Sequence, residues 1–140
     1  MSVMRAGTAG IKALAPSGEL LAEFQERKRA LVRAGTAPDA AHAAAHQGMD
    51  YRRRYLAELR ARPDALAALR QLIAEARTGD VYLMCMCGYE TPGRACHTYA
   101  LLDLARELDP SVRELTEPGP RRLASTSEGA GRGRRRHGDR

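Results

Sequence analysis

The stretch Val81-Tyr-Leu-Met-Cys-Met-Cys87 decides how the rest of the sequence is interpreted. It is apolar throughout and shows no alternation with polar residues, a pattern typical of a strand covered on both faces, as in a parallel sheet. The following segment, 88–94, contains Pro92 and Gly93 and predicts a loop. We therefore expect residues 81–87 to form the central strand of a small sheet.

The segments on both sides of this strand carry the periodicity of amphipathic helices. Leu and Ala recur at helical spacing, and six aromatic residues are too few for a bulky β-sandwich core. Ser17 is a suitable helix cap and Pro63 a suitable first helical residue. The predicted fold class is α/β, helix-rich, with a small, mostly parallel sheet flanked by helices over 18–34, 50–60, 63–77 and 96–108.

The length and composition of the chain predict one domain followed by a tail. A chain of 140 residues is long enough for a single core. We expect one α/β domain over residues 1–110, in which 35–48 is a linker, a short helix or an insertion. Residues 111–140 are rich in Glu, Pro, Gly, Ser and Arg and have few apolar side chains, so we expect a disordered, Arg-rich tail.

The net charge of +6 lies mostly in that tail. Residues 121–140 hold seven Arg against Glu128 and Asp139, which leaves 16 basic and 15 acidic residues in the first 120. The body is nearly neutral, so a basic groove across the domain is not expected. The Arg132–Arg136 cluster can contact nucleic acid weakly and without sequence specificity, or it can serve as a solubilising tail.

The sequence lacks the signals of membrane insertion and export. No apolar run approaches the roughly 20 residues that a membrane helix needs, and the first residues lack an apolar signal-peptide region. We expect a cytoplasmic protein with no membrane partner. Three cysteines without an export signal indicate reduced thiols rather than a disulfide framework.

The predicted strand-to-helix junction is the best candidate for chemistry. Ligands bind beyond the carboxyl ends of parallel strands, where Cys87 is expected, and Cys96 and His97 open the next helix. Helix N-terminal amides stabilise a thiolate, so Cys96 can act as a nucleophile with His97 and Cys87 beside it. Arg94 is the candidate anion-binding group.

Two other interpretations of these cysteines stay open. Cys85, Cys87, Cys96 and His97 together make a legitimate zinc ligand set, but adjacent ligands on a helix diverge by about 100 degrees, and structural sites use wider spacings. Alternatively, Cys85 and Cys87 are small apolar residues of a buried strand. We therefore expect no cofactor, with zinc as the weaker alternative.

The remaining aromatic and histidine residues have simpler interpretations. Tyr51 and Tyr55 lie one helical turn apart and are expected to face the core. His42, His46 and His137 look like polar residues of a linker or of the tail, with no partner set in the sequence.

Several motifs in order resemble the domain of unknown function 488 family, in particular its YeaO-like branch. Lys12-Ala-Leu-Ala-Pro-Ser17 resembles that branch's Lys-x-Leu-Ala-Pro-Ser segment, and 51–59 resembles its tyrosine helix. Cys87 and Cys96-His97 resemble its Cys and Cys-His-Arg pattern, although Thr98 stands here in place of that Arg. The likeness covers about residues 12–108.

The resemblance implies a fold more than an activity, because the family's own activity is not established. It also implies an additional N-terminal strand and a loop with an Asp-Arg pair, which we expect this chain to lack. The predicted function is a thiol-centred (Cys/His) site for a small molecule or anion. The alternative is a non-enzymatic binding or interaction module that touches nucleic acid through its basic tail.

Overall fold

The computed structural model describes residues 11–84 and 94–114, and in these residues the chain is helical. One short 3-10 helix is followed by five α-helices. In chain order they are η1 (Lys12–Leu14), α1 (Gly18–Arg33), α2 (Pro38–Gly48), α3 (Tyr51–Arg60), α4 (Pro63–Ala76) and α5 (His97–Leu108).

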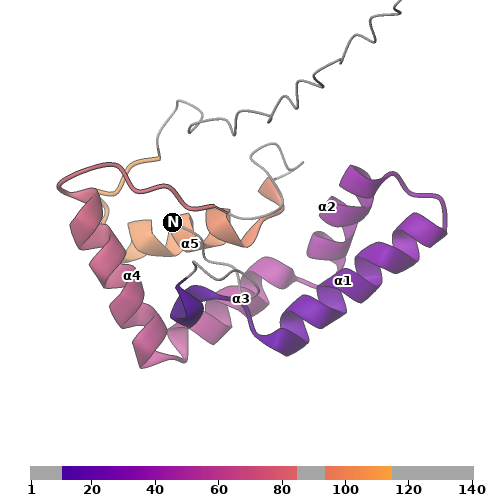
Figure 1. Ribbon diagram of the computed structural model, residues 1–140, viewed down its shortest axis with the longest axis horizontal. Helices are drawn as coiled ribbons and strands as arrows, with labels where there is room; N and C mark the ends of the chain where they lie inside the picture. Colours follow the sequence, from indigo (N-terminus) through magenta and orange to yellow (C-terminus); the bar gives the residue numbers. More distant parts are fainter. Residues whose placement is uncertain (1–10, 85–93, 115–140) are drawn as a thin grey trace, which may run out of the picture.

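Helix α3 lies at the centre of this array. It contacts each of the other four α-helices. The antiparallel pair α1 and α2 lies on one side of it and α4 on the other, with α5 running alongside (Figure 1). Since α3 is only ten residues long, its few side chains must serve several interfaces at once.

The predicted helix ends are confirmed by local chemistry. The Ser17 hydroxyl accepts a hydrogen bond from the Leu20 amide (3.1 Å), so it caps α1 as expected. Gly35 follows α1 with a φ of 98°, a conformation that only glycine adopts at little cost. Pro63 begins α4, where the missing amide hydrogen has no helical partner to lose.

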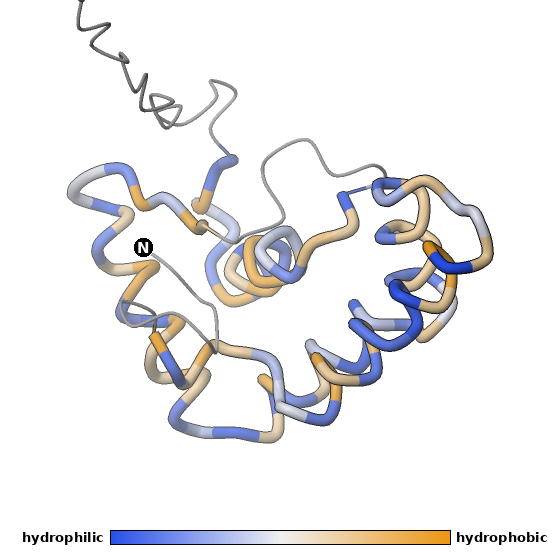
Figure 2. The backbone as a smooth tube through the Cα atoms, turned by 45° about the vertical axis from the view of Figure 1, so that its right-hand side comes forward, coloured by the Kyte–Doolittle hydropathy of each residue, from blue (hydrophilic) through white to orange (hydrophobic). Residues whose placement is uncertain are grey.

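The core is a single cluster built along the apolar faces of the helices. Figure 2 shows how apolar and polar residues alternate along each helix as its faces turn inward and outward. The largest side chains with almost no exposure are Leu14, Leu20, Tyr55, Leu59, Leu101 and Leu104. Tyr51 and Tyr55 are both buried in this cluster, which confirms that the tyrosines face the core.

Side chains of α3 and of the turn after it hold the Leu14–Ser17 segment in place. The Tyr55 hydroxyl donates to the Leu14 carbonyl (2.6 Å), and the Arg62 guanidinium donates to the carbonyl of the next residue, Ala15 (3.3 Å). The Glu58 carboxylate accepts from both the Ser17 amide (3.0 Å) and the Ser17 hydroxyl. The Leu-Ala-Pro-Ser motif is therefore a docked turn, in which side chains of α3 and Arg62 bind the carbonyls of Leu14 and Ala15 and the amide of Ser17.

The predicted α/β class is wrong, because the described residues form no β-strand and no sheet. Val81 to Leu83 are irregular, and Met84, a single β-bridge residue, is the nearest approach to a strand. Val81 and Leu83 are half-buried and pack on the helical core, where they border a groove between α4 and α5. Val81 and Leu83 thus cover a helical surface without strand partners among the described residues, and residues 85–87 of the expected strand lie outside that part of the chain.

Residues 35–48, expected to be a linker, a short helix or an insertion, contain the ordered helix α2. It packs mainly along α1. Ala41 and Ala45 are buried, and such small side chains allow close packing of α2 despite its lack of apolar bulk. The predicted tail lies almost wholly outside the described residues, which end at 114.

Nothing in the described part of the chain is both long enough and apolar enough to be a membrane-spanning helix.

We predict that Tyr55→Phe lowers the free energy of unfolding by about 1–3 kcal/mol, because it leaves the Leu14 carbonyl buried and unpaired. Urea unfolding should show a lower midpoint with an unchanged m-value. Ser111→Ala, which removes an exposed hydroxyl bonded to Asp109 two residues away, should change stability by less than about 0.5 kcal/mol. Equal effects of the two variants would contradict the role given to Tyr55.

Candidate functional site

A tight turn delivers Cys96 to the start of α5. Arg94 has a φ of 56°, in the left-handed region, and the Cys96 amide donates to the Arg94 carbonyl (2.8 Å) across Ala95. Cys96 is the N-cap residue of α5 with extended backbone angles, and it is 3% exposed. Its Sγ lies 3.2 Å from Oγ1 of Thr98. The predicted position of Cys96 at the opening of the last helix is confirmed.

His97 is the first residue of α5, and its imidazole points into the helical array rather than into solvent. The residue is 8% exposed, and its ring meets the Tyr55 ring edge-on, with 5.7 Å between centroids. Its Nε2 is buried and has no hydrogen-bond partner among the described residues. Buried polar atoms are paired in nearly all cases, so an unpaired imidazole nitrogen beside a thiol marks a place where a ligand or water can bind.

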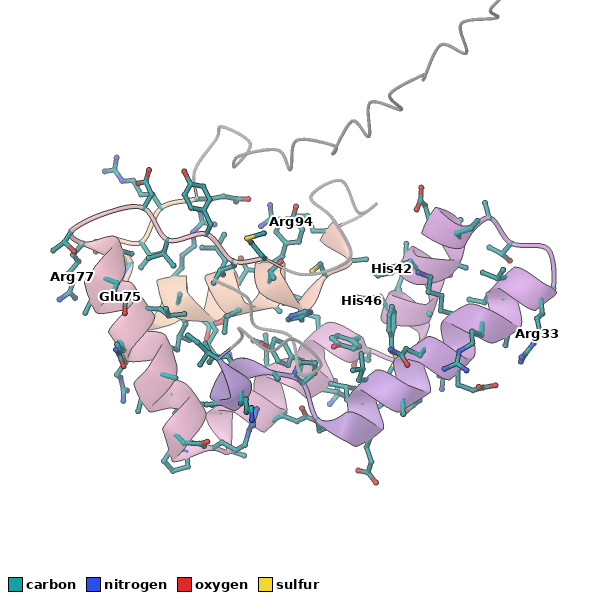
Figure 3. The ribbon with its side chains drawn as sticks, in the orientation of Figure 1. Arg33, His42, His46, Glu75, Arg77 and Arg94 are labelled. Atoms are coloured by element: carbon teal, nitrogen blue, oxygen red, sulfur yellow. The ribbon has the colours of Figure 1, made fainter. Side chains whose placement is uncertain are left out.

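Helix α2 brings two more histidines to the same region. His42 and His46 lie one turn apart on α2 (Figure 3). Nε2 of His42 lies 2.7 Å from the carbonyl oxygen of Ala95, and this contact is buried. Nδ1 of the same ring lies 3.5 Å from the Lys28 ammonium on α1. We call His42, His46, Cys96 and His97 the thiol–imidazole cluster.

His46 is held as a neutral imidazole. Its ring stacks on Tyr51 with 4.7 Å between centroids, and its Nε2, like that of His97, is buried without a partner among the described residues. Burial, with smaller contributions from His42 and His97, lowers the pKa of His46 to about 4, and Cys96 opposes this shift. Because Cys96 and His97 both act on this pKa, His46 lies within electrostatic range of both residues.

A row of aromatic rings packs against the thiol–imidazole cluster. Phe24 meets His42 edge-on (4.9 Å between centroids) and Tyr51 (5.4 Å), and Tyr51 lies 6.3 Å from Tyr55. These rings connect α1, α2 and α3 to the beginning of α5. Edge-to-face contacts of this kind fix ring orientation as well as burying area. The imidazoles are therefore held in set orientations.

Arg94, the predicted anion-binding residue, is already engaged. One of its terminal nitrogens lies 3.0 and 3.3 Å from the two carboxylate oxygens of Glu114, and its guanidinium stacks over the Tyr99 ring at 4.2 Å. Hydrogen bonding to Glu114 raises the pKa of Arg94. An anion would have to compete with Glu114 for this charge, so the anion-binding role of Arg94 stays a prediction.

The other predicted site residues are placed only in part. Cys85 and Cys87 lie outside the described residues, so the expected approach of Cys87 to Cys96 stays a prediction. Within residues 11–84 and 94–114 no group of three or more His, Cys, Asp or Glu is arranged to hold a metal ion. The alternative zinc set draws half of its ligands from beyond that part of the chain.

The sequence prediction missed His42 and His46, which looked like polar linker residues. A signal for them exists in the spacing. Ala41, Ala45 and Met49 recur at intervals of four, His42 precedes Ala45 by three positions, and all four are buried in the structure. Small residues and imidazoles on one face of an Ala-rich helix indicate close packing of that face rather than an exposed linker.

Comparison with known families agrees with the resemblance seen in the sequence. The family model DUF488-N3a, described as the active DUF488-N3 subclade, matches residues 8–108. No curated protein and no solved structure matches the chain. The match includes every residue of the thiol–imidazole cluster, whereas the likeness to the YeaO-like branch stays a prediction.

We predict that the unfolding free energy falls as the pH is lowered from about 6.5 toward about 4, because in this window the unfolded chain binds a proton at His46 and the folded chain does not. The contribution is complete above the ordinary pKa of 6.5. His46→Phe keeps a ring on Tyr51 but removes the titrating group, so its stability should fall less over this window. Urea unfolding at several pH values measures the difference.

Gln47→Ala, on the exposed side of the same helix, serves as the control and should follow the wild-type pH dependence. Parallel pH profiles for His46→Phe and the wild type would show that His46 is not buried as a neutral ring.

Proposed function

We propose a thiol-based function for this chain, which belongs to the DUF488-N3a family, the active DUF488-N3 subclade. In this proposal the chain binds a small anionic or electrophilic molecule at the N-terminus of α5 and acts on it through the Cys96 thiol. The observation that carries this proposal is the thiol–imidazole cluster. In it a buried cysteine that begins a helix is accompanied by the half-buried His46 and the buried His97, whose Nε2 atoms are both buried and have no partner among the described residues.

Two opposing effects act on the thiol. The positive end of the α5 dipole favours a negative charge at Cys96, whose side chain accepts no capping hydrogen bond from the first turn, and the Thr98 hydroxyl at 3.2 Å can donate to it. Burial of the side chain opposes ionisation. A helix N-terminus lowers cysteine pKa values in many reactive sites, so we expect the first effect to prevail.

The proposed roles follow from these positions. Cys96 is the nucleophile: its thiol loses its proton to solvent, and the thiolate electron pair forms a bond to an electrophilic atom of the ligand. The bond from that atom to a leaving group breaks in the same step, and its electron pair departs with the leaving group. His97 and His46 offer their Nε2 atoms to polar groups of that ligand. A neutral His46 can accept or donate one hydrogen bond, according to its tautomer. Two residues are secondary candidates. Cys87 would supply a second thiol, and Arg94 would supply a positive charge to an anionic ligand.

A single-thiol variant tests the proposal directly. In Cys85→Ser/Cys87→Ser, Cys96 is the remaining cysteine of the three in the chain. Its ultraviolet thiolate absorbance should appear at a pH clearly below the value of about 8.5 for an unperturbed thiol. Alkylation by iodoacetamide at about pH 6.5 should be about tenfold faster than that of free cysteine.

The matched control is Cys85→Ser/Cys96→Ser, which keeps Cys87 in place of Cys96. It shows whether the shifted titration belongs to Cys96 or is shared by the second candidate thiol. Absorbance reports ionisation even where burial slows the alkylating reagent. A Cys96 thiolate that forms only near the pH of free cysteine would reject the thiol proposal and favour the non-enzymatic alternative.

A further inference from the structure

We infer that His42 on α2 is a positioning residue for the proposed thiol site: it holds the turn that presents Cys96 at the start of α5. The inference rests on the proposed function, because it concerns the same thiol. It adds a residue from a helix that lies about fifty positions earlier in the chain and that the sequence motifs did not connect with the site.

The contact itself fixes the state of the imidazole. The Ala95 carbonyl oxygen can only accept a hydrogen bond, so Nε2 of His42, at 2.7 Å, must carry the hydrogen. The other nitrogen, Nδ1, faces the Lys28 ammonium at 3.5 Å and is therefore placed to accept. A series of polar contacts thus connects Lys28 on α1, through His42 on α2, to the turn formed by residues 94–96.

The turn needs this support. It combines a non-glycine residue with positive φ, Arg94, with a hydrogen bond that spans only two residues, from the Cys96 amide to the Arg94 carbonyl. Such backbone conformations are costly and persist where the surroundings impose them. His42 binds the carbonyl of Ala95, the central residue of the turn, from the buried side.

The outer side of the same turn is held by different groups. Glu114 binds the Arg94 guanidinium, which also lies over the Tyr99 ring. These contacts are exposed, whereas the His42 contact is buried and is less weakened by water and salt. His42 is therefore the group best placed to set the orientation of the turn, and with it the position of Sγ relative to the first amides of α5.

The packing of the His42 ring supports a positioning role over simple core filling. The ring is 6% exposed and meets Phe24 edge-on, so its orientation is set by an aromatic neighbour. Both ring nitrogens face polar groups, in contrast to His46 and His97, whose Nε2 atoms face none among the described residues. Within the thiol–imidazole cluster, both nitrogens of His42 therefore contact protein groups, whereas His46 and His97 each keep Nε2 available to bind a ligand.

Paired substitutions at His42 test the inference in the single-thiol chain that retains Cys96. His42→Gln places an amide donor near the position of Nε2 and should preserve the thiolate titration and the alkylation rate of Cys96 within about twofold. His42→Phe fills the space without a donor. It should move the titration toward that of free cysteine and slow alkylation at about pH 6.5 by roughly tenfold or more.

The core variant Ile73→Val on α4 controls for a general loss of stability. It should lower the unfolding midpoint without moving the Cys96 titration. Nitrogen NMR of the wild-type imidazole gives a test that does not depend on the folding of a variant, because the inference requires hydrogen on Nε2 of His42. Hydrogen on Nδ1 instead would overturn it.

The outcomes separate this inference from the proposed function. A wild-type Cys96 that titrates like free cysteine rejects the proposed function. A shifted wild-type titration that is unchanged in His42→Phe keeps the proposed function and rejects the positioning role. Rescue by His42→Gln together with loss in His42→Phe supports both.

Discussion

The hydrogen bond from the Tyr55 hydroxyl to the Leu14 carbonyl is the contact on which the rest of the structure depends. It joins the chain before α1 to the middle of α3, and it does so inside the core, where an unpaired carbonyl is costly. The same tyrosine ring meets His97 at the start of α5. One residue therefore fixes the entry to the first helix and supports the candidate site.

This arrangement explains why the motifs that resemble the family occur together. The Leu-Ala-Pro-Ser turn supplies backbone carbonyls and an N-cap serine, and the tyrosine helix supplies the groups that bind them, namely Tyr55 and Glu58. Burial raises the pKa of Tyr55, so the hydroxyl remains a donor at any ordinary pH. The two motifs form one interface, and this interface stabilises the fold.

Helices α1, α3, α4 and α5 could be predicted from the sequence, whereas the sheet that it led us to expect is absent from the described residues. Helix ends depend on near neighbours, so Ser17 and Pro63 were sufficient to place α1 and α4. A strand depends on partners elsewhere in the chain, and the apolar run from Val81 specifies none. Val81 and Leu83 bury part of their surface against the helices instead. An apolar run indicates that a segment will be buried, but it does not indicate the surface against which the segment packs.

In the candidate site, too, features that depend on adjacent residues could be predicted, and features that depend on distant residues could not. Cys96 and His97 were found because the helix start that makes them interesting is visible in the adjacent residues. His42 was missed because its partner, the Ala95 carbonyl, is a backbone group distant in the sequence, and a backbone group leaves no trace in residue type. Histidines in an Ala-rich segment acquire a role only when the helix is packed against a second surface.

The charges around the cluster limit the chemistry that it can support. His46 is neutral at physiological pH, Arg94 is paired with Glu114, and the His42 ring separates the Lys28 ammonium from the turn. Stabilisation of a negative charge at Cys96 must therefore come mainly from the α5 amides and the Thr98 hydroxyl. A helix N-terminus is equivalent to only about half a positive charge, which one thiolate already offsets. A thiolate and a bound anion would repel each other at the same helix end, so a ligand that reaches the ionised thiol should be neutral where it meets the sulfur.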